Sequence, residues 1–374
     1  MSVSRIGAVS AIALAGALAL SACATENPAP AGSTQGAGSS ASAGNVDCFS
    51  GDLAAEGSTA QKNAIAQAIK SYQEACADAT IDYNATGSGS GIKQFIAKQV
   101  AFAGSDSALK TKPKDGKVEA DEAKNACGSP AWNLPMAAGP IAIAYNVNGV
   151  DKLTLNAEVA AKIFNGQITT WNDPAIAALN KGVTLPATPI KVYFRSDESG
   201  TTENFTKYLQ AAAPSAWTAD PGKQWTGKGE GKEKSAGVSA AVKSQDGGIT
   251  YVEWSYAQQN QLHMAAIDTG SGPVELTGET AGKAIAAAKQ VGTGNDLALK
   301  LDYGTKEAGV YPIVLVTYEI VCSKYADAEQ GKKVKAFLKH YASADVQKSL
   351  EPLGYAPLPA EVLTKVDTAV DAIS

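Results

Sequence analysis

Three segments of the chain place Ser, Thr and Gly residues where a predicted strand turns into a predicted helix. They are Glu56–Ala60, Thr86–Gly91 and Arg195–Thr201. The first backbone N–H groups of a helix have no acceptor within the helix, and the helix macrodipole is positive at that end. With hydroxyl donors nearby, such a turn can bind an anion without any net charge. One turn of this kind is more commonly a helix cap, but three of them, one with an arginine, indicate an anion site.

Two of these turns share features with enzyme motifs, but neither completes the motif. Thr86–Gly91 lacks the glycine spacing of a dinucleotide-binding fingerprint and the Gly-Lys-Ser/Thr of a P-loop. Ser199 lies in Glu-Ser-Gly and not in the Gly-x-Ser-x-Gly of a nucleophile elbow. The chain also has only two histidines as candidate general bases. We therefore expect a protein that is not an enzyme.

Short strands alternating with amphipathic helices must position the three turns. Strand patterns cover 51–55, 79–83 and 190–194, and each is followed by its turn and then by a helix. The second of these helices is expected to begin at Ile92. This alternation is typical of α/β proteins. The segment 217–237, rich in Gly and Lys with two tryptophans, is predicted to be a surface loop, and the sequence assigns it no function.

The first 22 residues predict export. Arg5 is their only charge, and the apolar run 6–20 that follows is typical of a secretory signal and short for a membrane span. The run ends in Leu20-Ser21-Ala22-Cys23, which resembles the bacterial lipobox. We expect cleavage before Cys23 and its diacylation, because two acyl chains suffice for stable attachment; the alternative is an ordinary signal with an incidental cysteine. Residues 23–45 form a flexible tether.

The other cysteines predict disulfides. Setting Cys23 aside leaves an even number in an exported chain, for which three connectivities are possible. We favour Cys48–Cys76, which closes a local strand–helix unit, and Cys127–Cys322. A metal site is the alternative. None of the spacings is that of a metal-binding knuckle, and only two histidines are available as imidazole ligands. Neither a metal nor a cofactor is expected.

The net charge of −5 argues against a nucleic-acid partner and against long-range attraction of anions. An anion must then be held by local dipoles and a few donors. The N-termini of the predicted helices offer both the dipoles and the donors.

Several segments, in this order along the chain, resemble the phosphate-binding proteins (PstS) of the high-affinity phosphate ABC importer. The resemblance covers the chain from about Cys48 to Ile373. Its most specific piece is Arg195–Thr201, where the family commonly has Arg-Ser-Asp-Gly-Ser-Gly-Thr, so that Glu198 is a departure. The other matching segments are Thr86–Gln94, Phe102–Asp106, Ile163–Ile168 with Trp171–Asp173, Gly248–Glu253 and Tyr311–Ile313.

The resemblance implies that the three turns hold the phosphate. Thr59 would offer its hydroxyl and Ala60 its backbone N–H, although the family often has an aromatic residue where Ala60 stands. Ser88 would donate from the second turn. From the third turn, the resemblance implies four contact residues and a carboxylate that orients the guanidinium: Arg195, Ser199, Gly200 and Thr201, with Asp197. Arginine can donate to phosphate oxygens in a bidentate geometry that lysine cannot reproduce.

Asp106 completes the set that the resemblance implies. A carboxylate beside phosphate is repulsive unless it accepts a hydrogen bond, and phosphate near neutral pH still carries a proton to donate. Sulfate carries none, and a site that needs a ligand donor can reject an analogue without it by about four to five orders of magnitude. From the residues alone, a cap or surface carboxylate in a Gly-Ser-Asp turn is the alternative.

The same resemblance implies a two-domain periplasmic-binding-protein (Venus-flytrap) fold with two hinge crossings, near 135–139 and 311–312. Domain I would comprise 46–136 and 312–374, and domain II 137–311. Such a protein binds inorganic phosphate in the interdomain cleft and delivers it to the membrane permease subunits of an ABC importer. It would stand on the extracytoplasmic face of the cell membrane, held by its lipid anchor. The alternatives are a phosphatase-like enzyme that uses the same pocket, and a surface adhesin or structural lipoprotein.

Overall fold

The computed structural model describes residues 46–113 and 116–374, which belong to one compact unit. The predicted signal segment, the lipidated Cys23 and the tether 23–45 lie outside the described residues. Within the described ranges, no helix is long and apolar enough to cross a membrane.

A nine-stranded sheet runs through this part of the chain, with the order β2-β1-β3-β14-β4-β8-β6-β7 and with β9 paired to β4. Strands β1, β2 and β3 are parallel to one another, and β6 is parallel to β7 and β8. Strands β4 and β14 are antiparallel to each other in the middle of the sheet. The strands are β1 Gly51–Gly57, β2 Ala79–Ala85, β3 Phe102–Ser105, β4 Ala131–Asn146, β6 Lys191–Arg195, β7 Glu230–Lys232, β8 Gly248–Glu253, β9 His263–Met264 and β14 Val314–Cys322.

Two smaller sheets accompany it: a three-stranded sheet in the order β11-β10-β5, and a ribbon of β12 with β13. Their strands are β5 Thr154–Asn156, β10 Ala266–Asp268, β11 Pro273–Val274, β12 Lys289–Gln290 and β13 Leu299–Lys300. Helices connect the strands, so that the architecture is α/β as the alternation in the sequence predicted. The helices are α1 Lys62–Ala75, α2 Ser88–Ile96, α3 Glu119–Cys127, α4 Ala157–Phe164, α5 Pro174–Leu179, α6 Gly200–Ala212, α7 Lys234–Ser244, α8 Trp254–Gln259, α9 Gly278–Ala286, α10 Ala328–Ala342, α11 Ala344–Leu350, the 3-10 turn Glu351–Leu353 and α12 Ala360–Asp371.

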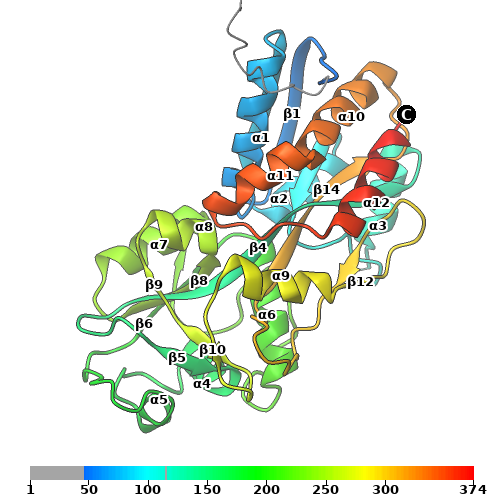
Figure 1. Cartoon of the computed structure of the whole chain (residues 1–374). Coiled ribbons are helices and arrows are strands. Elements are labelled where there is room, and N and C mark those ends of the chain that lie inside the picture. The colour runs from blue at the N-terminus through cyan, green and yellow to red at the C-terminus, as the bar shows by residue number, and fades with distance from the viewer. Residues whose placement is uncertain (1–45, 114–115) are drawn as a thin grey trace, which may run out of the picture. The chain divides into compact units, whose positions relative to one another are not determined.

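Two hydrophobic clusters divide the buried apolar residues into two lobes. The first lobe packs β1, β2, β3 and helices α1, α10 and α12 around Phe102, Phe337 and Tyr341. The second lobe packs β8, α4 and α6 around Phe164 and Phe205. The long strands β4 and β14 contribute residues to both clusters, and Figure 1 shows them running from one group of helices to the other. The two-domain architecture has two chain crossings at its centre, while the exact domain boundaries stay a prediction.

Helix α2 begins earlier than the apolar pattern indicated. We expected its first residue at Ile92, but it starts at Ser88, so that the Gly-Ser-Gly-Ser-Gly segment lies partly in the helix. Close packing explains the glycines: a Cβ on Gly91 would lie 2.5 Å from the Cα of Gly57, and one on Gly89 would lie 2.4 Å from a Glu198 carboxylate oxygen. Their small size, and not chain flexibility, is what this position requires.

Both disulfides have the pairing that we favoured from the sequence. Cys48 is bonded to Cys76 across 28 positions of sequence, and Cys127 to Cys322 across 195. The second ties the end of α3 to the end of β14. It therefore links two distant parts of the chain within the first lobe.

The prediction that 217–237 is a surface loop was wrong in part. Trp217 is 3 % exposed, and the ring of Trp225 stacks on those of Phe205 and Tyr251 with centroids 6.4 and 5.1 Å apart. The two tryptophans anchor the segment to the second core, while its lysines and glycines stay near the surface. The same segment contains β7 and the start of α7, and it supports the site described next.

Candidate functional site

The first turn joins β1 to α1 and contributes buried hydroxyl groups. Ser58 Oγ donates to Asp106 Oδ1 at 2.5 Å and accepts from the Ala60 backbone N–H at 3.0 Å. Thr59, only 2 % exposed, shares a 2.7 Å hydrogen bond between its Oγ1 and Ser235 Oγ. The Thr59 carbonyl accepts from the hydroxyl of Tyr256 at 3.2 Å. The turn thus touches two residues of the second lobe.

The second turn joins β2 to α2 and presents Ser88. The Ser88 hydroxyl donates to Asp106 Oδ2 at 3.1 Å and also lies 3.1 Å from the Asp106 backbone N–H, from which it accepts. Gly87 precedes the helix with a φ of +111°, a backbone conformation that glycine adopts without strain. The N–H of Gly89 donates across the lobes to the Glu198 carbonyl at 3.0 Å.

The third turn follows β6 and holds a buried arginine. Arg195 is 2 % exposed, and its Nε and Nη2 both donate to the Asp197 carboxylate, with Nε 2.7 Å from Oδ1. Its Nη1 donates to Ser235 Oγ at 3.1 Å and to Thr201 Oγ1 at 3.5 Å. Burial alone would raise the pKa of Asp197, but its hydrogen bond and ion pair with Arg195 lower that pKa below the usual value. The pair fixes the plane of the guanidinium.

Helix α6 begins at the same turn. Its N-cap is Ser199, whose Oγ accepts from the Thr202 N–H at 3.2 Å. Gly200 then passes so close to the first lobe that a Cβ would lie 2.5 Å from Ser88 Oγ and 2.6 Å from Asp106 Cβ. The N-terminal N–H groups of α6 lack acceptors within the helix, and they belong to the part of α6 that approaches the first two turns.

Asp106 lies where the three turns meet. Besides Ser58 and Ser88, the hydroxyl of Thr317 on β14 donates to its Oδ1 at 2.9 Å. Burial, the largest cause, and the nearby Glu253 raise the Asp106 pKa to about 6, although the three hydroxyl donors favour the ionised form. A carboxylate offers about four lone-pair sites, so the three hydroxyls leave room for one more donor.

All the contact residues predicted from the sequence lie together and are buried. The turns after β1, β2 and β3 provide Thr59, Ala60, Ser88 and Asp106, although Ala60 packs against the core of the second lobe, and the turn after β6 provides Arg195, Ser199, Gly200 and Thr201. The Ala60 N–H is bonded to Ser58 Oγ, so as a ligand donor it would have to share or exchange that bond.

Sequence reasoning missed several polar residues of the site. Ser235 links Thr59 to Arg195; Glu253 accepts from the Thr201 hydroxyl; and Asn204 donates to the carbonyl groups of Asp106 and Gly200 at 2.7 and 2.8 Å. The signal for Ser235 was a fourth strand-to-helix junction, from β7 to α7, hidden in the segment taken for a loop. Nothing in the local pattern singled out Asn204, which follows the third turn within α6.

Ion pairs cross between the lobes around the site. Lys93 on α2 contacts the Glu198 carboxylate at 2.6 Å, and Lys110 contacts Glu203 on α6. Lys223 in turn contacts Glu119 at 3.1 Å. Burial raises the pKa of Glu203, but its lysine neighbours outweigh that effect and hold the pKa well below its usual range. The residue that departs from the family motif, Glu198, is therefore one half of a bridge between the lobes.

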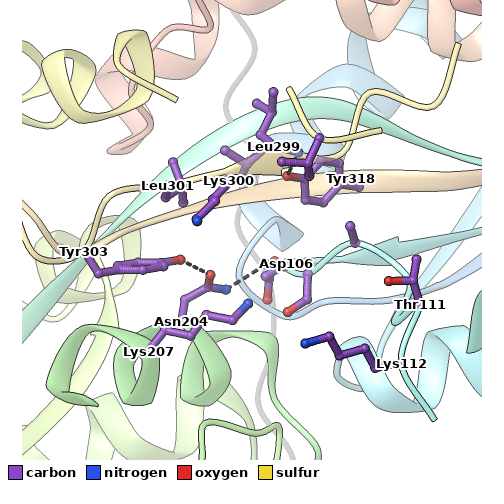
Figure 2. Close-up of a pocket in the computed structure, with 14 residues that line it drawn as sticks. Asp106, Thr111, Lys112, Asn204, Lys207, Leu299, Lys300, Leu301, Tyr303 and Tyr318 are labelled. Atoms are coloured by element: carbon purple, nitrogen blue, oxygen red, sulfur yellow. Dashed lines mark hydrogen bonds between the residues drawn. The ribbon is translucent and has the colours of Figure 1, made fainter. Parts of the chain in front are cut away.

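A cavity of about 550 Å³ reaches the site from one side. Figure 2 shows Asp106 and Asn204 in its wall, with the hydroxyl of Tyr303 donating to the amide oxygen of Asn204. Three lysines also line it, Lys112, Lys207 and Lys300. Among the described residues, no group of three or more His, Cys, Asp or Glu side chains could hold a metal ion.

Comparisons with known proteins identify the family and the fold of the chain. Residues 27–345 match the family model described as the PBP superfamily domain. The chain is 48 % identical over 380 residues to phosphate-binding protein PstS3 of Mycobacterium bovis, covering the whole of both chains. It is 49 % identical over 338 residues to PstS2 of the same organism, covering 89 % of this chain and 90 % of the relative.

Solved structures share the fold at lower sequence identity. A high-affinity periplasmic phosphate-binding protein, PfluDING, solved with phosphate bound, superposes with a TM-score of 0.67 at 23 % identity over 85 % of this chain and 93 % of its own. A phosphate-binding protein of Stenotrophomonas maltophilia gives a TM-score of 0.66 at 20 % identity, over 85 % of this chain and 94 % of the other. These matches confirm the predicted two-domain binding-protein fold.

Proposed function

The chain belongs to the PstS family of phosphate-binding proteins, and from this premise we propose that it binds inorganic phosphate where its three turns meet. The family consists of non-enzymatic, extracytoplasmic components of ABC phosphate transport, and the protein is a member of that class. The proposed contact residues are those predicted from the sequence: Thr59, Ala60, Ser88, Asp106, Arg195, Ser199, Gly200 and Thr201, with Asp197 in support.

The observation that carries the proposal is the pairing of a buried arginine with a buried carboxylate among hydroxyl donors. The Arg195 guanidinium and the hydroxyls of Thr59 and Ser88 can donate to phosphate oxygens. An oxyanion there would take the Thr59 hydroxyl from its neutral bond with Ser235 into a charge-assisted bond, which is shorter and about twice as strong, and the Ser88 hydroxyl would turn from Asp106 to the ligand. Asp106 keeps a free acceptor position for the proton that phosphate carries and sulfate lacks.

Closure of the lobes follows from where the donors lie. The first lobe offers Thr59 and Ser88, and the second offers Arg195 and the start of α6, so a bound anion joins the two. The crossing strands β4 and β14 would act as the hinge, with domain I as 46–136 and 312–374 and domain II as 137–311. Binding energy from the second lobe then favours the closed form that the permease subunits recognise.

The proposed attachment to the membrane rests on the N-terminal sequence. Diacylation of Cys23 would supply two chains, enough for stable anchoring. The segment that follows, up to residue 45, would let the folded unit reach the permease.

Calorimetric titration of the protein lacking residues 1–22 tests the function. We expect saturable phosphate binding that sulfate does not displace, and no turnover of a phosphoester. Arg195→Gln should weaken phosphate binding by at least about a hundredfold, because it removes a buried charge-assisted donor. Lys191→Gln, an exposed change on the same strand, is the matched control. Failure of the parent protein to bind phosphate saturably would refute the proposal, and phosphoester turnover would favour a phosphatase.

A further inference from the structure

The cavity beside Asp106 is built by both lobes and by strand β13 of the β12–β13 ribbon. Its first-lobe wall is the segment after β3, which includes Lys112, and its second-lobe wall is α6, with Asn204 and Lys207. Strand β13 contributes Lys300 and β14 contributes Tyr318. With about 550 Å³, the cavity is far larger than a single oxyanion.

The charge of this cavity is opposite to that of the protein. Lys112, Lys207 and Lys300 line it, and the only carboxylate among its lining residues is Asp106, whose oxygens already accept three hydroxyl bonds. Figure 2 shows Lys112 and Lys207 extending from different elements toward Asp106, and the Lys300 amine on the side of Tyr303. A chain with a net charge of −5 thus has a cationic hollow at its proposed phosphate site.

Part of the remaining wall is apolar, and this part strengthens the effect of the lysines. Leu299, Leu301 and Val316 form part of it, and Val291 at its edge is 58 % exposed. Low-dielectric walls around charges of one sign concentrate the electric field and raise the local concentration of counter-ions. The wall therefore makes the cavity a better collector of anions than three lysines on an open surface.

The position of the cavity connects it to the deeper site. The proposed contacts Thr59, Ser88 and Arg195 are at most 2 % exposed. Asp106 and Asn204 belong both to the cavity wall and to the hydrogen-bond network of those contacts. An anion held by the lysines would thus be separated from the donors at the start of α6 only by residues that line both places.

We infer that this cavity is the entrance to the phosphate site and acts as a first, weak anion site in which Lys112, Lys207 and Lys300 collect phosphate from solution. The inference rests on the proposed function and adds the route of the ligand. Affinity resides in the buried donors, and the lysines set how often phosphate reaches them.

Association rates test the entrance. Rapid filtration with radiolabelled phosphate would compare the parent with Lys112→Gln/Lys207→Gln/Lys300→Gln at low and high salt. At about 10 mM ionic strength, where the Debye length is about 30 Å, we expect association to slow about tenfold in the triple variant. At about 1 M, where that length falls to about 3 Å, the two rates should converge.

The control removes equal charge elsewhere. Lys181, Lys191 and Lys348 are exposed and lie outside the cavity lining, and their triple Gln variant should slow by less than about twofold. Because Lys207 also pairs with the buried Glu203 at 2.7 Å, Lys112→Gln/Lys300→Gln leaves that pair intact and should slow association about fivefold.

Two different failures can be told apart. If the parent binds phosphate and the cavity variants slow no more than the control variant, the entrance is refuted while the proposed function stands. If the parent retains no phosphate in the same assay, the proposed function itself fails, and the entrance fails with it.

Discussion

Replacing Asp106 by asparagine should raise the free energy of unfolding at neutral pH and should also weaken the discrimination between phosphate and sulfate. Asp106 is 3 % exposed, and burial raises its pKa from the usual 3.8 to about 6. In the unfolded chain the carboxyl ionises at its ordinary pKa, so at neutral pH folding must bury a charge that water stabilises better. Asparagine has nearly the same shape and no charge, and the hydroxyls around it can rotate to accept from its amide.

The magnitude follows from the pKa. A rise from 3.8 to about 6 corresponds to about 3 kcal/mol of folding free energy. Because the folded-state pKa is the higher one, this penalty is small at pH 4, grows as the pH rises from about 4 to about 6, and keeps its full size above that. The free energy of unfolding of Asp106→Asn, minus that of the parent, should therefore increase by up to about 3 kcal/mol between pH 4 and pH 7.

Urea unfolding at several pH values, in buffers free of phosphate and sulfate, measures this difference. Other titrating groups are shared by the two proteins and largely cancel. Asp82→Asn, at an exposed position on β2, removes the same formal charge from the surface and serves as the control. A difference between Asp106→Asn and the parent that is equal at pH 4 and pH 7 would show that burial of the Asp106 charge is not penalised.

The same variant tests ligand selection. An amide can donate to sulfate, whereas the carboxylate can only accept, so the ratio of phosphate to sulfate affinity should fall by an order of magnitude or more. Competition calorimetry gives that ratio directly. Undiminished rejection of sulfate by Asp106→Asn would mean that the carboxylate does not sense the proton of the ligand.

Two further variants test the contacts between the lobes. Ser235→Ala removes a buried hydroxyl that accepts from Arg195, and phosphate titration should show binding weakened about tenfold; Ser244→Ala, at the exposed end of the same helix, should bind like the parent. Glu198→Gln breaks the pair with Lys93, and because Lys93 is largely exposed and Glu198 partly so we expect at most a fivefold weaker affinity. The effect of Glu198→Gln on phosphate affinity should vanish at high salt. A loss of affinity that persists there would show that the Lys93–Glu198 ion pair does not stabilise the closed form.

The sequence was sufficient for the architecture because local signals and family motifs agreed. The strand-to-helix junctions at 56–60, 86–91 and 195–201 were visible in the pattern, and the structure brings them together. The start of α2 at Ser88 could not be predicted from local propensity, since its glycines are disfavoured in helices. Tertiary packing overrides that preference: Gly89 and Gly91 lie where no Cβ would fit.

The residues that escaped prediction contribute through contacts distant in sequence. Ser235 lies 176 positions from its partner Thr59, and Thr317 lies 211 positions from Asp106. Each is an ordinary hydroxyl in its own segment, and only the pairing of β14 with β3 or the docking of α7 gives it a role. Without those pairings, no spacing rule separates such residues from other serines and threonines.

The charges at the site explain how an acidic protein can bind an anion. The single cation, Arg195, is matched by Asp197, and two further buried carboxylates, Asp106 and Glu253, lie close by. The buried residues therefore carry no positive excess, and affinity has to come from hydrogen bonds and helix starts. An excess of positive charge lies in the neighbouring cavity, at Lys112, Lys207 and Lys300. There it can speed the association of phosphate and sulfate alike. Selection between them then belongs to Asp106, the lining residue that also bonds to the buried hydroxyls of Ser58 and Ser88.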